Sequence, residues 1–178
     1  MLKIAQLLLV LFLLAVKDAG AQFKPVDGQS AIRFTIKNFG IRVGGTLRGI
    51  DGNIHFDPAR LNEAAFDINI DAATVNTDNA LRDDHLKGES YLDIKHYPKI
   101  HFLSTQVAAS NKTGTWILTG RLTIRDHVKE ISFPFSAAAA MGGYLFKGTF
   151  RINRKDFEVG GTSTISDEME INLNVFAN

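Results

Sequence analysis

The residues best suited to chemistry in this chain stand together in one short stretch, Arg82-Asp83-Asp84-His85. Asp and His side chains ligate metal ions, and Arg with His can bind the polar head group of a ligand. A metal site needs three or four convergent ligands, and adjacent Asp83 and Asp84 cannot point the same way on a helix. The pattern therefore disfavours a metal site. It leaves open a structural network that pins this stretch and a head-group contact made by Arg82 and His85.

The distribution of histidines, serines and glycines gives little sign of catalysis. The five histidines fall on separate predicted elements, and none forms the H-E-x-x-H pair of zinc hydrolases. The G-x-S-x-G pattern of serine hydrolases does not occur. We therefore predict a protein that is not an enzyme and has no cofactor. One catalytic hypothesis remains, in which His85 acts with Asp83 or Asp84 on a lipid head group.

The elements that position this stretch are β-strands on both sides of one short helical segment, predicted roughly over residues 78–95. Asp78 or Asn79 is suited to begin the helix, because both side chains cap free backbone N–H groups. Leu81 and Leu86 are its expected buried contacts.

The remaining chain alternates apolar and polar side chains with a period of two, which is typical of half-buried strands. Residues 66–71 are the clearest example. About eight strands follow one another at the spacing of an antiparallel meander, and a sheet of this length must close to protect its edges. An eight-stranded barrel is either filled with side chains or holds one small ligand. The inward set is rich in Phe, Ile and Leu, with 13 Phe in the chain, so we expect an apolar interior.

Several local patterns make finer predictions. Asp51-Gly52 indicates a hairpin turn, residues 137–143 a loop of small side chains, and residues 157–161 a further strand. Glycine inside a strand, as at Gly45, marks a bulge, a bend or a close backbone approach. Pro134 cannot donate to a strand ladder, so its strand should be bulged or lie at an edge there.

The first 21 residues are predicted to be a cleaved secretory signal peptide, and residues 22–178 a single domain. Lys3 precedes an apolar run over residues 4–16, and Ala19-Gly20-Ala21 provides a small-residue cleavage site. The run is shorter than the roughly 20 residues of a membrane-spanning helix, so we expect no stable membrane insertion after cleavage. The chain has no cysteine, and its stability must come from a core.

The charge balance argues against a polyanionic partner. The chain has 20 Lys and Arg against 19 Asp and Glu, and loss of the leader removes two Lys and one Asp, leaving a neutral chain. This predicts no nucleic-acid binding. It also lacks the basic cluster expected of a protein held to anionic lipid head groups.

The order of motifs resembles a known family. The blocks Gly45-Thr46-Leu47, Arg82-Asp83-Asp84-His85-Leu86 and Tyr97-Pro98-Lys99-Ile100-His101-Phe102, followed by Gly120-Arg121-Leu122, look like the YceI-like family of bacterial periplasmic proteins. The resemblance covers nearly all of residues 22–178. It implies a lipocalin-like antiparallel β-barrel with an elongated apolar pore that binds a long isoprenoid, often as a homodimer, and it carries no defined catalytic residues.

From these observations we expect a periplasmic carrier that buries a polyisoprenoid or isoprenoid quinone in its barrel. The alternatives are a filled barrel in a structural or stress-related interaction protein, and the head-group enzyme described above. Arg82 and His85 are the expected polar contacts. The residues expected to line the cavity are Ile32, Phe34, Ile36, Phe66, Ile68, Phe102, Trp116, Leu118, Phe133, Phe150, Leu173 and Val175. For Trp116 the alternative is that it closes one end of the barrel.

Overall fold

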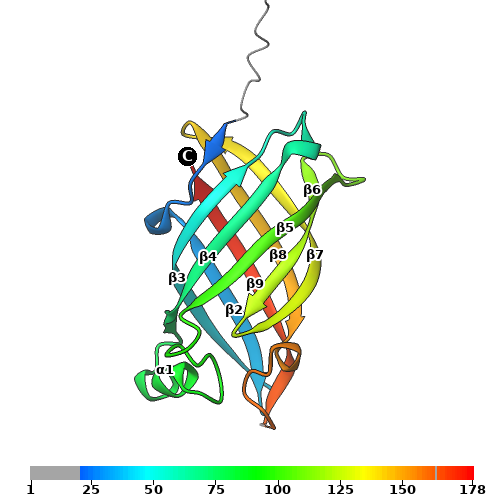
Figure 1. Ribbon diagram of the computed structural model, residues 1–178. Helices are drawn as coiled ribbons and strands as arrows, with labels where there is room; N and C mark the ends of the chain where they lie inside the picture. The colour runs from blue at the N-terminus through cyan, green and yellow to red at the C-terminus, as the bar shows by residue number, and fades with distance from the viewer. Residues whose placement is uncertain (1–20, 163) are drawn as a thin grey trace, which may run out of the picture.

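The computed structural model describes residues 21–162 and 164–178, and Figure 1 shows an elongated barrel with one short helix at its lower end. The predicted signal peptide, apart from Ala21, lies outside the described residues. The strands are β1 (Gln22–Phe23), β2 (Ala31–Asn38), β3 (Ile41–His55), β4 (Ala65–Asn76), β5 (Lys99–Ala109), β6 (Thr115–Ile124), β7 (His127–Ala140), β8 (Gly143–Asn153) and β9 (Ile165–Ala177). The helix is α1 (Ala80–Lys87), and three 3₁₀ turns are η1 (Asp27–Gln29), η2 (Leu61–Glu63) and η3 (Arg154–Phe157).

The predicted all-β antiparallel barrel is confirmed. The sheet runs in the order β1-β3-β2-β9-β8-β7-β6-β5-β4, and a further pairing between β3 and β4 closes eight strands into a ring. β1 is a two-residue addition beside the end of β3. Each β-strand neighbour is antiparallel, so consecutive turns alternate between two ends of the barrel. None of the helices in residues 21–162 and 164–178 has the length and apolar character needed to cross a membrane.

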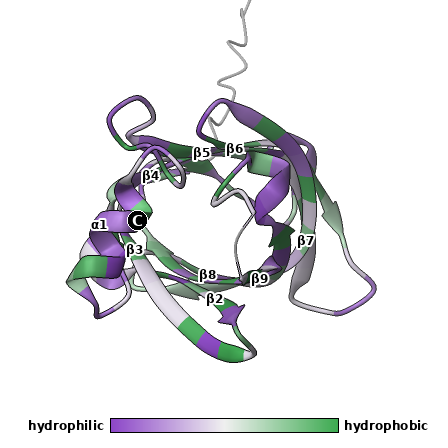
Figure 2. Ribbon diagram, turned by 90° about the horizontal axis from the view of Figure 1, so that it is seen from below, coloured by the Kyte–Doolittle hydropathy of each residue, from purple (hydrophilic) through white to green (hydrophobic). Residues whose placement is uncertain are grey.

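The two ends of the barrel are built from different segments. The upper end in Figure 1 holds β1, the β3–β4, β5–β6 and β7–β8 connections, and the C-terminus. The lower end holds α1, the β6–β7 turn, η3 and the tip of the β2–β3 hairpin. Figure 2 views the ring from this lower end and shows α1 and the β2–β3 hairpin on its rim.

The predicted helix forms within the expected segment. The side chain of Asn79 caps it by accepting a hydrogen bond from the backbone N–H of Arg82 at 3.0 Å. Leu86 points into the barrel and lines its interior, but the prediction for Leu81 is wrong, since its side chain is 85% exposed. The helix is largely polar, so its place is fixed by hydrogen bonds more than by an apolar face.

The Asp51-Gly52 hairpin prediction is wrong, because β3 passes straight through this pair. The pairing of β3 with β4 shifts register between Arg48 and Asp51, which marks a β-bulge. Gly52 has φ +134°, and a Cβ there would clash with the carbonyl oxygen of Asp67. The register shift lies just before Gly52, which pairs with Ile68, and the absence of a side chain at Gly52 lets the backbones of β3 and β4 approach closely.

Two further boundaries differ from the predictions. Residues 137–140 continue β7 as a regular strand, and only Met141-Gly142 turns the chain before β8. Residues 137–140 pair with β8 alone, and alanine is compatible with a strand, so a run of small side chains does not by itself indicate a loop. Residues 157–161 form the end of η3 and a turn instead of a strand, because Arg154 binds the backbone of this segment, as described below.

The prediction for Pro134 is confirmed in its edge form. β7 pairs with β8 only from Phe135 to Ala140, so Pro134 lies where that ladder has ended and needs no donor on that side. Below this point the two strands are joined by side chains, with the Phe133 and Phe150 rings stacked at a centroid distance of 4.3 Å.

Candidate ligand-binding cavity

An apolar cavity of about 410 Å³ lies inside the barrel. All eight strands of the ring contribute to its wall. The volume lies within the range of roughly 300–1,000 Å³ typical of small-molecule sites. Successive side chains of a strand point to opposite faces of the sheet, so every second residue of each strand points into the barrel. This alternation explains the lining.

Eleven of the twelve residues predicted to line a cavity do so: Ile32, Phe34, Ile36, Phe66, Ile68, Phe102, Leu118, Phe133, Phe150, Leu173 and Val175. Trp116 is not part of the lining. Its ring instead packs against Phe56 and Phe135, at centroid distances of 5.2 Å and 5.8 Å. Trp116 therefore belongs to a group of aromatic side chains that fills the upper end of the barrel.

The upper end is closed by what we call the aromatic plug, which consists of Phe23, Phe56, Phe66, Trp116, Phe135, Tyr144 and Phe146. Phe56 is its centre, with five other rings at centroid distances between 5.2 and 6.2 Å. Most of these contacts are edge-to-face, the geometry that aromatic quadrupoles favour. Phe66, Phe135 and Phe146 also line the cavity, so the plug forms its floor.

Strand glycines make room for two of the wall phenylalanines. Phe34 pairs directly with Gly45 across β2 and β3, and a Cβ at Gly45 would meet the Phe34 ring. A Cβ at Gly120 would likewise meet the ring of Phe102. A Cβ at Gly45 would also lie 2.9 Å from the backbone carbonyl oxygen of Asn76, so the close backbone approach, one of the three predictions for this glycine, is confirmed.

The Arg82-Asp83-Asp84-His85 stretch lies at the lower end, which we call the mouth. The carboxyl group of Asp83 is buried and accepts hydrogen bonds from the backbone N–H of Thr77 at 2.9 Å and from its hydroxyl at 2.6 Å. Arg82 donates from Nε to the Thr77 hydroxyl at 2.7 Å and from Nη2 to the Thr77 carbonyl at 2.8 Å. The network ties α1 to the end of β4, as the structural interpretation of this stretch predicts.

Arg82 and His85 nevertheless reach the cavity, and both are part of its lining. The bonds to Thr77 use Nε and Nη2 of Arg82, and within the described part of the chain Nη1 has no acceptor. The His85 ring lies 4.8 Å from the Tyr91 ring, centroid to centroid. These two side chains place polar groups at the opening of a chamber whose lining is mostly apolar.

Arg154 is a lining residue that sequence reasoning missed. It is 2% exposed and donates to the backbone carbonyls of Ser166, Val159, Gly161 and Ile165 at 2.7–3.3 Å. It also forms an ion pair with Asp167 at 3.2 Å. The sequence does contain an indication of its inward position. Phe150 and Ile152 point into the barrel, and the alternation of β8 with a period of two continues to residue 154.

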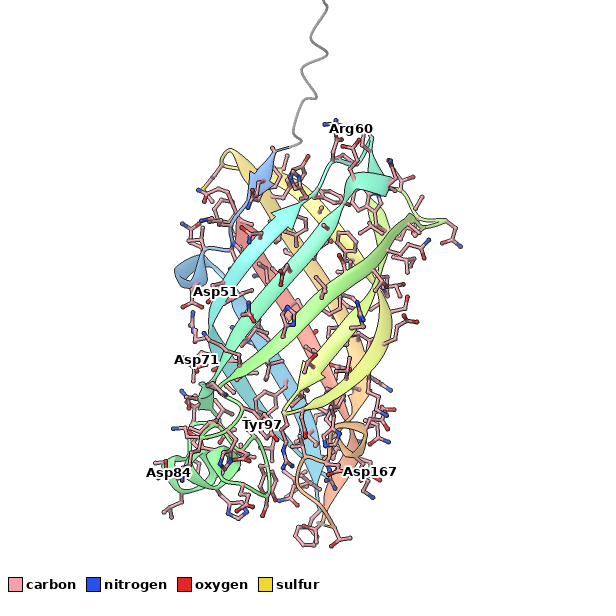
Figure 3. The ribbon with its side chains drawn as sticks, viewed as in Figure 1. Asp51, Arg60, Asp71, Asp84, Tyr97 and Asp167 are labelled. Carbon is pink, nitrogen blue, oxygen red and sulfur yellow. The ribbon has the colours of Figure 1, made fainter. Side chains whose placement is uncertain are left out.

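Hydrogen bonds between loops tie one side of the mouth together. The backbone N–H of Gly160 donates to the carbonyl of Ser90 at 2.8 Å, and Arg125 donates to the carbonyl of Glu158 at 2.7 Å. The guanidinium of Arg125 also lies 5.9 Å from the centre of the Tyr97 ring. Burial raises the pKa of the Tyr97 phenol, and the nearby Asp126 raises it further. Figure 3 shows Tyr97, Asp84 and Asp167 at this end and Arg60 at the other.

The mouth does not gather the residues of a metal or hydrolytic site. Across residues 21–162 and 164–178, no three His, Asp or Glu side chains converge as metal ligands. Asp83 is bound to Thr77, and Asp84 is paired with Lys87 at 3.9 Å. The acid–base pair required by the enzyme hypothesis, His85 with either aspartate, is therefore not assembled among these residues.

Known proteins show the same organisation. A UPF0312 protein of Pseudomonas savastanoi is 31% identical over 155 residues, covering 83% of this chain and 80% of the relative. The crystal structure of Burkholderia cenocepacia BcnA has the same fold, with a TM-score of 0.81, 24% identity, and coverage of 86% of this chain and 99% of that one. A Campylobacter jejuni YceI protein is 30% identical with a TM-score of 0.67, over 75% of this chain and 83% of that one.

A more distant structure, titled as a polyisoprenoid binding domain from Saccharophagus degradans, has a TM-score of 0.71 at 11% identity. It covers 88% of this chain and 97% of its own. The family model for the YceI-like domain matches residues 23–177. The chain therefore belongs to the YceI-like family, as the resemblance of its motifs indicated.

Proposed function

We propose that this protein binds one long apolar lipid, a polyisoprenoid or an isoprenoid quinone, inside the barrel and carries or sequesters it. No bond is made or broken in this function. The observation that carries the proposal is the character of the chamber: one continuous cavity with a mostly apolar lining, an aromatic floor, and the side chains of Arg82 and His85 at its mouth. Such a chamber suits a ligand with a long tail and one small polar end.

The binding energy would come from burial of the tail. Each buried methylene contributes roughly 0.8 kcal/mol, so a five-carbon isoprene unit gives at most about 4 kcal/mol. Ordering of a flexible chain and loss of translational freedom offset part of this gain. A few buried units are therefore sufficient for useful affinity. Arg82 Nη1 and the His85 ring would contact the polar end, since both border the cavity at the mouth.

Relatives support the choice of ligand class. The solved Saccharophagus degradans domain of the same fold is titled as polyisoprenoid binding. The periplasmic location rests on the predicted signal peptide over residues 1–21, and cell fractionation tests it. The homodimer implied by the family resemblance is tested by sedimentation of the mature chain.

Two alternatives make different predictions. A filled barrel in an interaction protein has no space for a ligand, and the cavity of about 410 Å³ disfavours it. The enzyme hypothesis requires His85 for turnover, so His85→Ala should abolish hydrolysis of a lipid head group while leaving tail binding intact. A carrier should show no turnover in either form.

The decisive experiment is native mass spectrometry of the mature protein from its own periplasm, followed by organic extraction and reloading with defined isoprenoids. We expect a bound lipid of defined mass. A matched pair of variants locates it: Ile36→Trp places an indole inside the cavity, while Thr35→Trp places one on the outer face of the same strand. The carrier function fails if the protein is empty and stays empty when isoprenoids are offered, or if both variants bind alike.

A further inference from the structure

Large apolar side chains that face solvent gather around the mouth. Six are exposed within the described residues, and four of them belong to mouth segments: Phe39 and Ile41 in the β2–β3 hairpin, Leu81 in α1, and Val128 at the start of β7. Single exposed apolar residues are normal on protein surfaces. Four exposed apolar side chains around the opening of one cavity are more than this background explains.

The tip of the β2–β3 hairpin carries the most prominent pair. Phe39 and Gly40 turn the chain with φ values of +50° and +80°, a geometry that favours Asn-Gly. Phenylalanine at a positive φ is uncommon, and here its side chain is 77% exposed. Ile41, two residues on, is 71% exposed. Folding alone gives no reason to place two such side chains in water at this turn.

The hairpin behind the tip is basic. Lys37 and Arg42 are both exposed and lie directly opposite each other on β2 and β3, where like charges repel. In the described part of the chain neither forms an ion pair. Lys37 and Arg42 line a small groove together with Glu168 and Glu170. Both glutamates are already paired with Arg151, at 2.8 Å and 3.7 Å. The stretch from residue 28 to residue 50 contains no acidic residue.

We propose that the mouth docks on the surface of an anionic phospholipid bilayer through the β2–β3 hairpin. Phe39 and Ile41 enter the head-group region, and Lys37 and Arg42 bind lipid phosphates, which relieves their mutual repulsion. The purpose of this contact rests on the proposed lipid-binding function, because it turns the cavity opening towards the membrane in which such a ligand dissolves. The chain without its leader has no net charge, which argues against membrane binding, but residues 28–50 contain Arg33, Lys37, Arg42 and Arg48 and no acidic residue.

A second copy of the chain fits this surface less well. A two-fold symmetric contact through the hairpins would bring the Lys37 and Arg42 pairs of both copies together. An anionic surface offers the opposite charge, so it is the occupant that the local electrostatics favour.

The hairpin at the other end of the barrel provides a matched control. Met141-Gly142 turns β7 into β8 with φ values of +45° and +81°, and Met141 is 76% exposed. Phe39→Asn and Met141→Asn therefore remove an equally exposed apolar side chain from the same type of turn. Asn suits this turn type, so neither variant should lose the fold.

The test is co-sedimentation of the mature chain with vesicles of phosphatidylcholine alone and of phosphatidylcholine with phosphatidylglycerol. We expect binding to the anionic vesicles that weakens with salt. Phe39→Asn should lower the partition coefficient about tenfold, the effect of exposing one buried aromatic side chain. Lys37→Gln with Arg42→Gln should lower it roughly thirtyfold at low salt. Met141→Asn should leave it unchanged.

The outcomes separate this proposal from the proposed function, because isoprenoid binding in vesicle-free solution is measured on the same variants. Lipid binding in solution without any vesicle binding overturns the docking proposal and leaves the carrier function standing. Vesicle binding by a chain that takes up no isoprenoid overturns the carrier function alone. Equal losses for Phe39→Asn and Met141→Asn, or a dimer that only Phe39→Asn dissociates without vesicle binding, also overturn membrane docking.

Discussion

The two ends of this barrel are organised in opposite ways. The closed end is filled by aromatic side chains that contact one another, with Phe56 only 3% exposed at the centre of the plug. The mouth is held by two buried polar side chains: Asp83 accepts a hydrogen bond from the backbone N–H of Thr77, and Arg154 donates one to the backbone carbonyl of Val159. One end is therefore stabilised by packing, and the other by fixing loops around a space that stays open.

A single closed sheet can therefore combine a packed core at one end with a ligand chamber at the other. Packing of large rings yields most of the stability of a small domain, so a hollow barrel must concentrate it somewhere. Here Phe23 of the short strand β1 joins the plug through an edge-to-face contact with Tyr144, at a ring-centroid distance of 5.3 Å. The polar groups of the mouth hold the loops through directional hydrogen bonds. These bonds do not require side chains to fill the interior, so they leave room for a ligand.

The largest expected effect comes from truncating the centre of the plug. Phe56→Ala should lower the free energy of unfolding by about 3–5 kcal/mol, through lost burial and a new cavity. Phe34→Ala removes the same ring from the cavity wall, where one face already borders empty space, and should cost distinctly less. Urea unfolding measures both. Equal costs would mean that the chamber wall is packed as tightly as the plug.

The second effect tests the hydrogen bonds of the mouth. Arg154→Met keeps an apolar body but leaves the carbonyls of Val159, Gly161 and Ser166 without their donor, at about 2–3 kcal/mol. Hydrogen exchange should rise in residues 158–167 and stay unchanged in the plug. Arg154→Lys, which keeps the charge with fewer donors, should fall between wild type and Arg154→Met. A uniform rise in exchange over the whole barrel would contradict a local role.

The third effect separates two adjacent aspartates on α1. Asp83→Ala leaves the buried backbone N–H and hydroxyl of Thr77 without an acceptor and should cost about 1–3 kcal/mol. Asp84→Ala removes an exposed carboxylate whose pair with Lys87 spans 3.9 Å, and should stay within about 0.5 kcal/mol. Thermal unfolding of the two variants provides the measurement. Similar losses for both would show that the Thr77 network does not hold the helix.

Most of the fold was accessible from the sequence because alternation with a period of two is a strong signal in a half-buried strand. The same alternation places Ile32, Phe34 and Ile36 on the cavity wall. It does not tell how far along the barrel a side chain lies, so the sequence alone does not decide between the wall and the closed end for Trp116, which belongs to the closed end. Position along the axis depends on the stagger between strands, which only the closed ring fixes.

The errors at Asp51-Gly52 and Leu81 have a common cause. A glycine can serve a close backbone approach inside a strand as well as a turn, and only the pairing of β3 with β4 decides between them. A leucine on a short helix is buried only if that face meets the barrel, and the Thr77 network orients α1 so that Leu81 faces solvent. In both cases a long-range contact overrules a local pattern.

The smallest effect concerns pH at the tied side of the mouth. Burial, with Asp126 close by, raises the pKa of the Tyr97 phenol in the folded chain above its ordinary value near 10. As the pH rises past that value the unfolded chain loses this proton first, so the folded state binds more protons and its stability falls. Tyr97→Phe should make the decline in unfolding free energy between pH 9 and 11 less steep, and Asp126→Asn should fall between the two. Denaturant titrations across this interval measure the slopes. A slope that is the same with and without the hydroxyl would mean that the phenol titrates alike in both states. Tyr97 would then differ little from a residue in water, and the tied side of the mouth would be more open than its hydrogen bonds imply.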